Sequence, residues 1–212
     1  KVELLVTKGA VACETSVDLA RQALDNDMPY EGERLLEHAQ RLAVSRGWQR
    51  LQAMLLAEQV RVRLQRGNFT GAEQLQRQLE QMAASFRMDA EHPCQRAIVM
   101  SASLGRSRLL LARGQAPQAC VLLAEMVSDQ ESRRDRLTAA RLRTLWSLAL
   151  WNSGKTAAAR TTFQPVVQLA EQQHLTGLFL DAGDTLQPLL IGMNESSSAC
   201  KEKGGVHEPW AD

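Results

Sequence analysis

Apolar residues recur along this chain at the three- to four-residue spacing of amphipathic helices, and short polar turns interrupt them. Four helical stretches each end at such a turn, and a second helical stretch follows each turn. The first stretches cover residues 17–25, 49–66, 97–113 and 136–153. The second stretches are expected to end near Ser45, Phe86, Val127 and Gln173. The pattern therefore predicts a helix, turn, helix unit that is repeated about four times.

The four turns resemble one another in sequence. They start at Asp27, Gly67, Gly114 and Gly154, so successive turns are 40, 47 and 40 residues apart. Five residues after each start stands a small residue, where two helices can approach closely. These small residues are Gly32, Ala72, Ala119 and Ala159. A repeat of this length predicts an all-α fold, an α-solenoid superhelix of stacked, tetratricopeptide-like antiparallel helix pairs.

Composition supports this class and excludes several kinds of partner. Of the 212 residues, 44% are hydrophobic and only 4% are aromatic, and good helix formers dominate. The 25 basic and 24 acidic residues leave a net charge of +1, which gives no global attraction to nucleic acid or to an anionic membrane. No apolar run is long enough to span a bilayer, so we expect a cytoplasmic protein without a membrane partner.

No arrangement of catalytic or metal-binding residues stands out. The four cysteines are far apart and form no C-x-x-C pair with nearby histidines. His38 and His174 each stand alone, without a nucleophile or carboxylate that would make them catalytic bases. We therefore expect no enzyme activity, and neither a metal nor another cofactor, in this chain.

The tripeptide Gly154-Lys155-Thr156 has the last three residues of a phosphate-binding P-loop. However, Ala149 holds the place of the first glycine of that motif, and the preceding residues form a helical pattern rather than a buried strand. We therefore expect a turn between two helices. In this turn Gly154 ends one helix at positive φ, Thr156 caps the next helix, and Lys155 points to water.

The pattern changes after residue 174. A short apolar run and a final helix, capped by Asp184 and interrupted by Pro188, are expected to close the stack. The predicted helical domain covers residues 1–192. Residues 193–212 are polar and rich in serine, glycine and lysine, which predicts a flexible linker leading to a DNA-binding domain not present here.

The segment HLTGLFLDAGDTLQPLL, from His174 to Leu190, resembles the closing segment of the helical domain in the large ATP-dependent transcriptional activators of the MalT type, within the LuxR superfamily. The preceding helix pair is similar to the last pair of that domain, and the resemblance extends over roughly residues 1–190. In that family the helical domain lies between a nucleotide-binding module and a helix-turn-helix DNA-binding domain. The resemblance implies a sensor that receives a small-molecule inducer or a regulatory protein and controls oligomerisation. ATP and DNA would then bind only to other parts of the parent protein.

Polar residues on the first helix of each pair suggest where an effector binds, because these helices line the concave face of a solenoid. The candidate ligand-binding residues are Arg21, Glu58, Arg61, Arg108, Arg141 and Trp151. Arg21, Arg61 and Arg108 each precede their turn by six residues, so we expect them to form an exposed column in the groove. Glu58 stands one helical turn before Arg61 and is expected either to pair with it or to face a ligand. Arginine binds carboxylates and phosphates through its bidentate fork, and tryptophan offers a face for stacking. Each residue taken alone is more typical of an ordinary solvated or salt-bridged helix surface than of a ligand contact.

Five arginines stand between Arg133 and Arg143. Such a run can bind nucleic acid, but this one lacks interleaved aromatic residues and starts a helix, where the helix dipole disfavours cations. A solvated turn, or a contact between the subunits of a homo-oligomer, explains the run better. Two hypotheses for function therefore remain. The first is an effector-sensing domain of a bacterial transcriptional activator, and the second is a tetratricopeptide-like adaptor that binds proteins and is unrelated to transcription.

Overall fold

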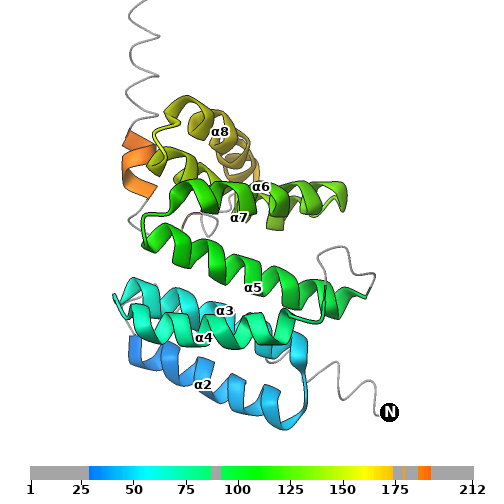
Figure 1. The fold of residues 1–212 in the computed structure, drawn as a ribbon. Coiled ribbons are helices and arrows are strands. Elements are labelled where there is room, and N and C mark those ends of the chain that lie inside the picture. Colours follow the sequence, from blue (N-terminus) through cyan, green and yellow to red (C-terminus); the bar gives the residue numbers. More distant parts are fainter. Residues whose placement is uncertain (1–28, 87–91, 174–178, 180–185, 192–212) are drawn as a thin grey trace, which may run out of the picture. The chain divides into compact units, whose positions relative to one another are not determined.

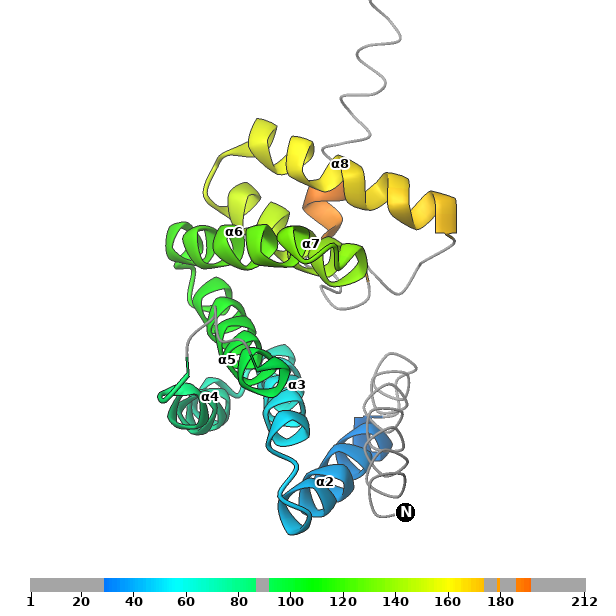
Figure 2. The same cartoon turned by 90° about the vertical axis from the view of Figure 1, so that its right-hand side faces the viewer.

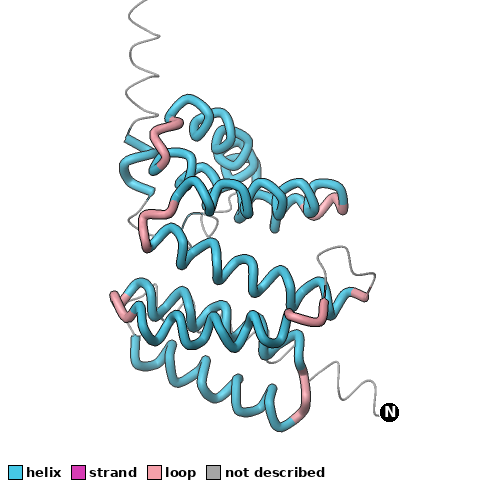
Figure 3. The backbone as a smooth tube through the Cα atoms, viewed as in Figure 1, coloured by secondary structure: helices cyan, strands magenta, loops and turns pink. Residues whose placement is uncertain are grey.

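The computed structural model describes residues 29–86, 92–173, 179 and 186–191 (Figure 1). Within these ranges the chain is all-helical, which confirms the predicted fold class. The helices are α2 (Pro29–Ser45), α3 (Gln49–Gln65), α4 (Phe69–Ala83), α5 (Pro93–Ala112), α6 (Ala116–Ser132), α7 (Arg136–Asn152) and α8 (Thr156–Gln173). A short helical turn covers residues 186–191. Short loops join α2 to α3, α3 to α4, α5 to α6, α6 to α7 and α7 to α8 (Figure 3).

The chain divides into two compact units, residues 1–122 and 123–212, and the division falls inside α6. In the first unit α3 packs against α2, α4 and α5, so that it lies between α2 on one side and the α4–α5 pair on the other (Figure 2). In the second unit α7 packs along α8. Antiparallel helix pairs are therefore present in each unit, while their stacking into one superhelix stays a prediction.

Five turns between helices share one backbone geometry. Their central residues have positive φ angles of 67°, 69°, 73°, 61° and 77°, at Gly47, Gly67, Gly114, Arg134 and Gly154 respectively. In each turn the next residue donates its amide hydrogen to the carbonyl five residues earlier, as Lys155 does to Leu150 at 2.9 Å. This is the Schellman motif, which satisfies the last carbonyls of a helix and favours glycine at the left-handed position. The predicted turn at Gly154 is confirmed.

The starts of the helices after these turns depend on side-chain caps in two cases. Asn68 Oδ1 accepts a hydrogen bond from the amide of Gly71 at 2.9 Å, and Asp135 Oδ1 accepts one from the amide of Thr138 at 3.0 Å. The prediction that Thr156 caps α8 is wrong, because Thr156 is already the first helical residue. Lys155 holds the preceding position, and its side chain is exposed as predicted.

The small residues that were expected at close helix approaches are all buried: Gly32, Ala72, Ala119 and Ala159. Trp48 is partly buried against the apolar cluster between α2 and α3, and Trp146 is partly buried on α7. In the second unit the fully buried ring of Phe163 lies edge-on to Phe179, with ring centroids 5.8 Å apart. Each unit therefore has apolar side chains packed inside it.

Several predictions lie outside the described residues. These are Arg21, the turn at Asp27, the cap at Asp184, most of the closing segment and the linker 193–212. Pro188 is described, and residues 186–191 run helically through it, so the predicted interruption at Pro188 is wrong.

Candidate functional site

The structure buries three of the residues that were expected to face an open groove. Only 1% of Glu58, 4% of Arg61 and 8% of Arg108 is exposed, so the expectation that they are solvent-exposed is wrong. For Glu58 and Arg61 the reason is the position of α3, which has neighbouring helices on two sides and therefore buries residues around most of its circumference. Arg108 is buried because α5 packs against both α3 and α4. A role for these residues in ligand binding stays a prediction, and any ligand would have to enter the helix packing.

Glu58 and Arg61 form a buried ion pair within α3. Arg61 Nε donates a hydrogen bond to Glu58 Oε1 at 2.6 Å, and Arg61 Nη2 lies 2.5 Å from the same oxygen without the alignment of a hydrogen bond. Arg61 Nη1 also donates to Gln65 Oε1 at 3.3 Å. The predicted pairing of Glu58 with Arg61 is therefore confirmed. Because burial removes the charge of Arg61 from water, Arg61 depends on this carboxylate for compensation.

The remaining members of the predicted column do not meet at one place. Arg108 on α5 donates from Nη1 to the carbonyl of Ala57 on α3 at 3.3 Å, which brings it next to the Glu58–Arg61 pair. In the second unit Arg141 is exposed on α7 and Trp151 is partly buried near the end of the same helix. Ten residues of helix separate them by roughly 15 Å. The structure therefore groups Glu58, Arg61 and Arg108 and leaves Arg141 and Trp151 apart from each other.

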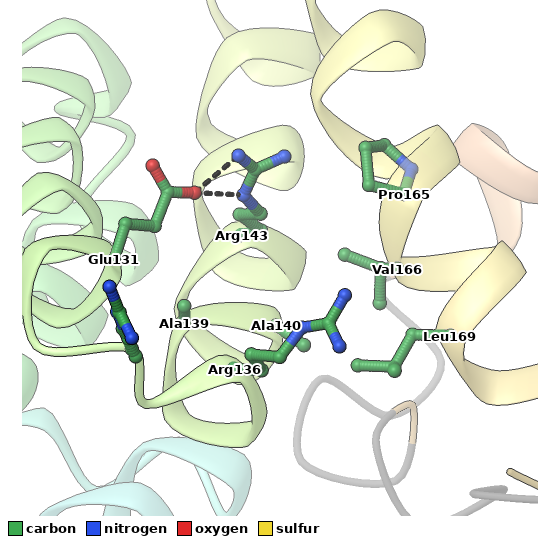
Figure 4. A pocket seen from close by; sticks show the side chains of 9 residues that line it. Glu131, Arg136, Ala139, Ala140, Arg143, Pro165, Val166 and Leu169 are labelled. Carbon is green, nitrogen blue, oxygen red and sulfur yellow. Dashed lines mark hydrogen bonds and ion pairs between the residues drawn. The ribbon is translucent and has the colours of Figure 1, made fainter.

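A hollow of about 530 Å³ lies in the second unit, between the end of α6, the start of α7 and the middle of α8 (Figure 4). We call it the arginine hollow. Its charged lining consists of Glu131, Arg134, Arg136 and Arg143. Its apolar floor consists of Ala139, Ala140, Pro165, Val166 and Leu169. This size lies within the range of about 300–1,000 Å³ that is typical of small-molecule sites.

The charges of the arginine hollow are only partly balanced. Arg143 Nε donates to Glu131 Oε1 at 2.8 Å, and Arg143 Nη2 pairs with the same oxygen, so this pair joins α7 to α6. The guanidinium groups of Arg134 and Arg136 make no hydrogen bond or ion pair with any residue that the structure describes. Figure 4 shows Arg136 lying over Ala140 with its charged end toward Val166 and Leu169. Two guanidinium groups that have no partner among the described residues therefore lie beside an apolar surface.

The neighbouring Arg133 differs from these residues. It does not line the arginine hollow, and its Nε donates to both carboxylate oxygens of Asp129 at 3.0 Å. The hydrogen bond that Arg133 donates to the Asp129 carboxylate raises the pKa of Arg133. The arginines of this run therefore have different surroundings. Arg133 pairs with Asp129 on α6, while Arg134, Arg136 and Arg143 line the arginine hollow.

Arg134 occupies the left-handed backbone region that the equivalent turns fill with glycine. Its φ of 61° makes it the one non-glycine residue with positive φ in the described part of the chain. A Cβ atom in this conformation approaches the neighbouring carbonyl oxygen and costs about 1–2 kcal/mol. Strained residues cluster at functional sites, so an arginine kept here points to a use for its side chain.

Replacing Arg134 with glycine is expected to raise the free energy of unfolding by about 1 kcal/mol, because glycine adopts this φ without the Cβ contact. The matched control is Gly154→Arg, which introduces the same side chain at the same place in another turn and should lower stability by a similar amount. A Cβ at Gly154 would meet no other atom within 4 Å, so backbone strain alone would act there. Urea unfolding measures both effects. A loss of stability in Arg134→Gly would show that the Arg134 side chain has a structural role.

A second hollow, of about 270 Å³, lies in the first unit between α4, α5 and the start of α6. Its charges are largely paired across the two helices, as Arg106 Nη1 with Glu80 Oε1 at 3.1 Å and Arg113 with Glu73. Gln76 closes its base, donating from Nε2 to the carbonyl of Ala102 at 2.9 Å. Paired charges and a smaller volume make this hollow a weaker candidate than the arginine hollow.

The sequence predicts a ligand-binding role for Arg141 of the arginine run, but not for Arg134, Arg136 or Arg143, which line the hollow. The usable signal was the spacing of the turns, since Arg134 stands 20 residues after Gly114 and 20 before Gly154. Gly47 and Gly67 have the same separation. An arginine at a place where the pattern asks for glycine marks an unusual position.

Comparisons with known proteins do not assign the chain to a family. The chain matches no protein-family model, no curated protein and no solved structure.

The described residues include no group of three His, Cys, Asp or Glu side chains that could hold a metal ion. None of the described helices is both long and apolar enough to cross a membrane.

Proposed function

We propose that this chain is the effector-sensing helical domain of a bacterial transcriptional activator of the MalT-like type, and that the effector binds in the arginine hollow. The repeated helix pairs with Schellman turns support a solenoid, an architecture that serves binding more often than catalysis. The resemblance of the segment 174–190 to the closing segment of that family supports the transcriptional role.

The observation that carries the proposal is the arginine hollow itself. Small-molecule sites are concave and mostly apolar, with a few polar groups that fix the orientation of the ligand. The arginine hollow has this composition, with five apolar residues below and four charged residues around them. ATP and DNA contacts would belong to other parts of the parent activator, and this chain would supply effector binding and the contacts that change oligomeric state.

The expected result is a thermal stabilisation of the chain by its effector. A ligand present at 100 times its dissociation constant should add about 2.7 kcal/mol to the free energy of unfolding. For a protein of this size that corresponds to a rise in Tm of roughly 5–10 °C. A thermal-shift screen against a library of bacterial metabolites measures it, and Arg136→Ala identifies the hits that occupy the arginine hollow.

Two outcomes would contradict the proposal. If no metabolite shifts the Tm, while the chain captures a defined peptide or protein, the adaptor hypothesis replaces the sensor hypothesis. If a metabolite binds the chain but Arg136→Ala leaves its affinity unchanged, the effector site lies elsewhere, and the group of Glu58, Arg61 and Arg108 becomes the next place to test.

A further inference from the structure

We infer that the arginine hollow selects a carboxylic acid with an apolar body, and that the carboxylate of the ligand takes Arg143 from Glu131. This inference rests on the proposed function and names the chemistry of its effector. It also assigns a consequence to binding, because the Arg143–Glu131 pair is a link between α7 and α6.

The charge balance of the arginine hollow demands an anion. Three arginines and one glutamate line it, so its formal charge is +2. Arg134 and Arg136 have no carboxylate partner among the described residues, and the nearby Arg133 is already paired with Asp129. A guanidinium binds a carboxylate through two parallel hydrogen bonds, which are stronger than bonds between neutral groups.

The floor of the arginine hollow demands an apolar body. Ala139 and Ala140 of α7 face Pro165, Val166 and Leu169 of α8, and none of these five side chains has a polar atom. Ala139, Ala140 and Val166 are already buried, while Pro165 is exposed and Leu169 is half-buried. A small hydrated anion such as acetate or inorganic phosphate would leave the exposed apolar surface of Pro165 and Leu169 in contact with water. An aliphatic or aromatic acid would cover the floor with its body while its carboxylate reaches the arginines.

Glu131 shows how such a carboxylate is held. It already presents one oxygen to Nε and Nη2 of Arg143, which is the contact that a ligand carboxylate would make. Both side chains are partly exposed, at 26% for Arg143 and 45% for Glu131, so exchange needs no opening of the core. Surface ion pairs of this kind contribute little stability, and a ligand that brings its own apolar contacts can displace one.

Exchange at Arg143 would release the end of α6. Glu131 is in the last turn of α6, and the turn that follows it holds Arg134 in its strained conformation. A ligand that binds Arg134 and Arg143 together would therefore replace the Arg143–Glu131 pair as the contact that fixes this turn. A ligand shifts a conformational equilibrium only if it makes different contacts in the two states. Here the two states differ in the partner of Arg143, which is Glu131 without ligand and the ligand carboxylate with it.

The test is isothermal titration of the chain with octanoate, compared with 1-octanol and with acetate. Octanoate has both the apolar body and the carboxylate, while each control probe lacks one of them. We expect octanoate to bind at least roughly tenfold more tightly than either control, because loss of a charge-assisted hydrogen bond or of buried apolar area has an effect of that size. Higher salt concentrations should weaken the binding of octanoate and leave the affinity for 1-octanol unchanged.

Four variants locate the binding. The variants Arg136→Ala and Arg134→Gly should lower the affinity for octanoate roughly tenfold or more. Arg133→Ala removes a charge from the same run without touching the arginine hollow and should leave the affinity unchanged. Glu131→Gln should tighten octanoate binding, since it removes the competitor for Arg143. A purely structural role of the Glu131–Arg143 pair would not tighten binding, so this variant separates exchange from general damage.

Equal affinity for octanoate and 1-octanol would overturn the inference, and so would unchanged octanoate affinity in Arg136→Ala. Weaker octanoate binding in Glu131→Gln would overturn the exchange at Arg143. A neutral metabolite that stabilises the chain and loses affinity in a variant of the apolar floor such as Val166→Ala, but not in Arg136→Ala, would overturn the carboxylate assignment while the sensor proposal stands. If no screened metabolite of any charge binds, the proposed function fails as well.

Discussion

Replacing Glu58 with leucine should lower the free energy of unfolding by about 3–5 kcal/mol, because it leaves the buried guanidinium of Arg61 without its carboxylate. Arg61 is 4% exposed, and its other hydrogen bond, to the amide oxygen of Gln65 at 3.3 Å, is long and carries no counter-charge. Urea unfolding, together with hydrogen exchange of the amides in α3, measures the loss where it arises.

The double replacement Glu58→Leu with Arg61→Met is the control for this experiment. It removes both charges and fills the same space with apolar atoms, and such exchanges of a buried ion pair are often neutral or stabilising. The double variant should therefore recover most of the stability that Glu58→Leu loses. If the single and double variants were equally unstable, the loss would come from the shape of the side chains and not from an uncompensated charge.

The sequence pattern predicts an exposed Arg61 in a groove, whereas the structure buries this residue between helices. A polar residue at a regular helical spacing predicts exposure only when one side of the helix is free. The helix Gln49–Gln65 is buried by neighbours on two sides. Leu51 and Leu55 lie on the face that packs against α2, while Val60 lies on the opposite face toward α4 and α5. That distribution was present in the sequence and argued for a central helix.

Helices, turns and close approaches followed from the sequence because each depends on neighbours along the chain. A small residue such as Ala72 marks a helix contact, and Gly67 marks a left-handed turn, whatever the rest of the fold does. The arginine hollow depends on residues from three helices and on a backbone angle at Arg134 that its residue type disfavours. No local pattern predicts such a place, and only the 20-residue spacing pointed to it.

The buried arginines Arg61 and Arg108 differ from the exposed arginines Arg134 and Arg136 in whether their hydrogen-bond donors are available to a ligand. Burial of Arg61 and Arg108 requires partners within the protein, and the structure provides them in Glu58 and in the carbonyl of Ala57. Arg134 and Arg136 are exposed, so water can satisfy them, and an incoming anion has to replace only that water. Exposure next to an apolar floor therefore distinguishes the arginines that we propose bind the ligand from those that are paired within the protein.

Phe163→Ala should destabilise the second unit by about 3–5 kcal/mol, because it removes a fully buried ring and leaves a cavity. The ring also loses its edge-on contact with Phe179, at an interplanar angle of 63°. Leu137, which is 43% exposed at the start of α7 in the same unit, is the control, and Leu137→Ala should cost much less. Unfolding can be followed by tryptophan fluorescence with Trp48 and Trp210 replaced by phenylalanine, so that only Trp146 and Trp151 of α7 report.

The same variant tests how the core supports the arginine hollow. Phe163 is buried in α8 just before Pro165 and Val166, which belong to the apolar floor. Loss of the ring should let this part of α8 shift toward the cavity, so the affinity for octanoate should fall even where the variant remains folded. A Phe163→Ala chain that unfolds as readily as the parent chain would show that this ring is not part of a packed core. A variant that is destabilised but binds octanoate unchanged would show that the floor keeps its shape through its contacts with α7.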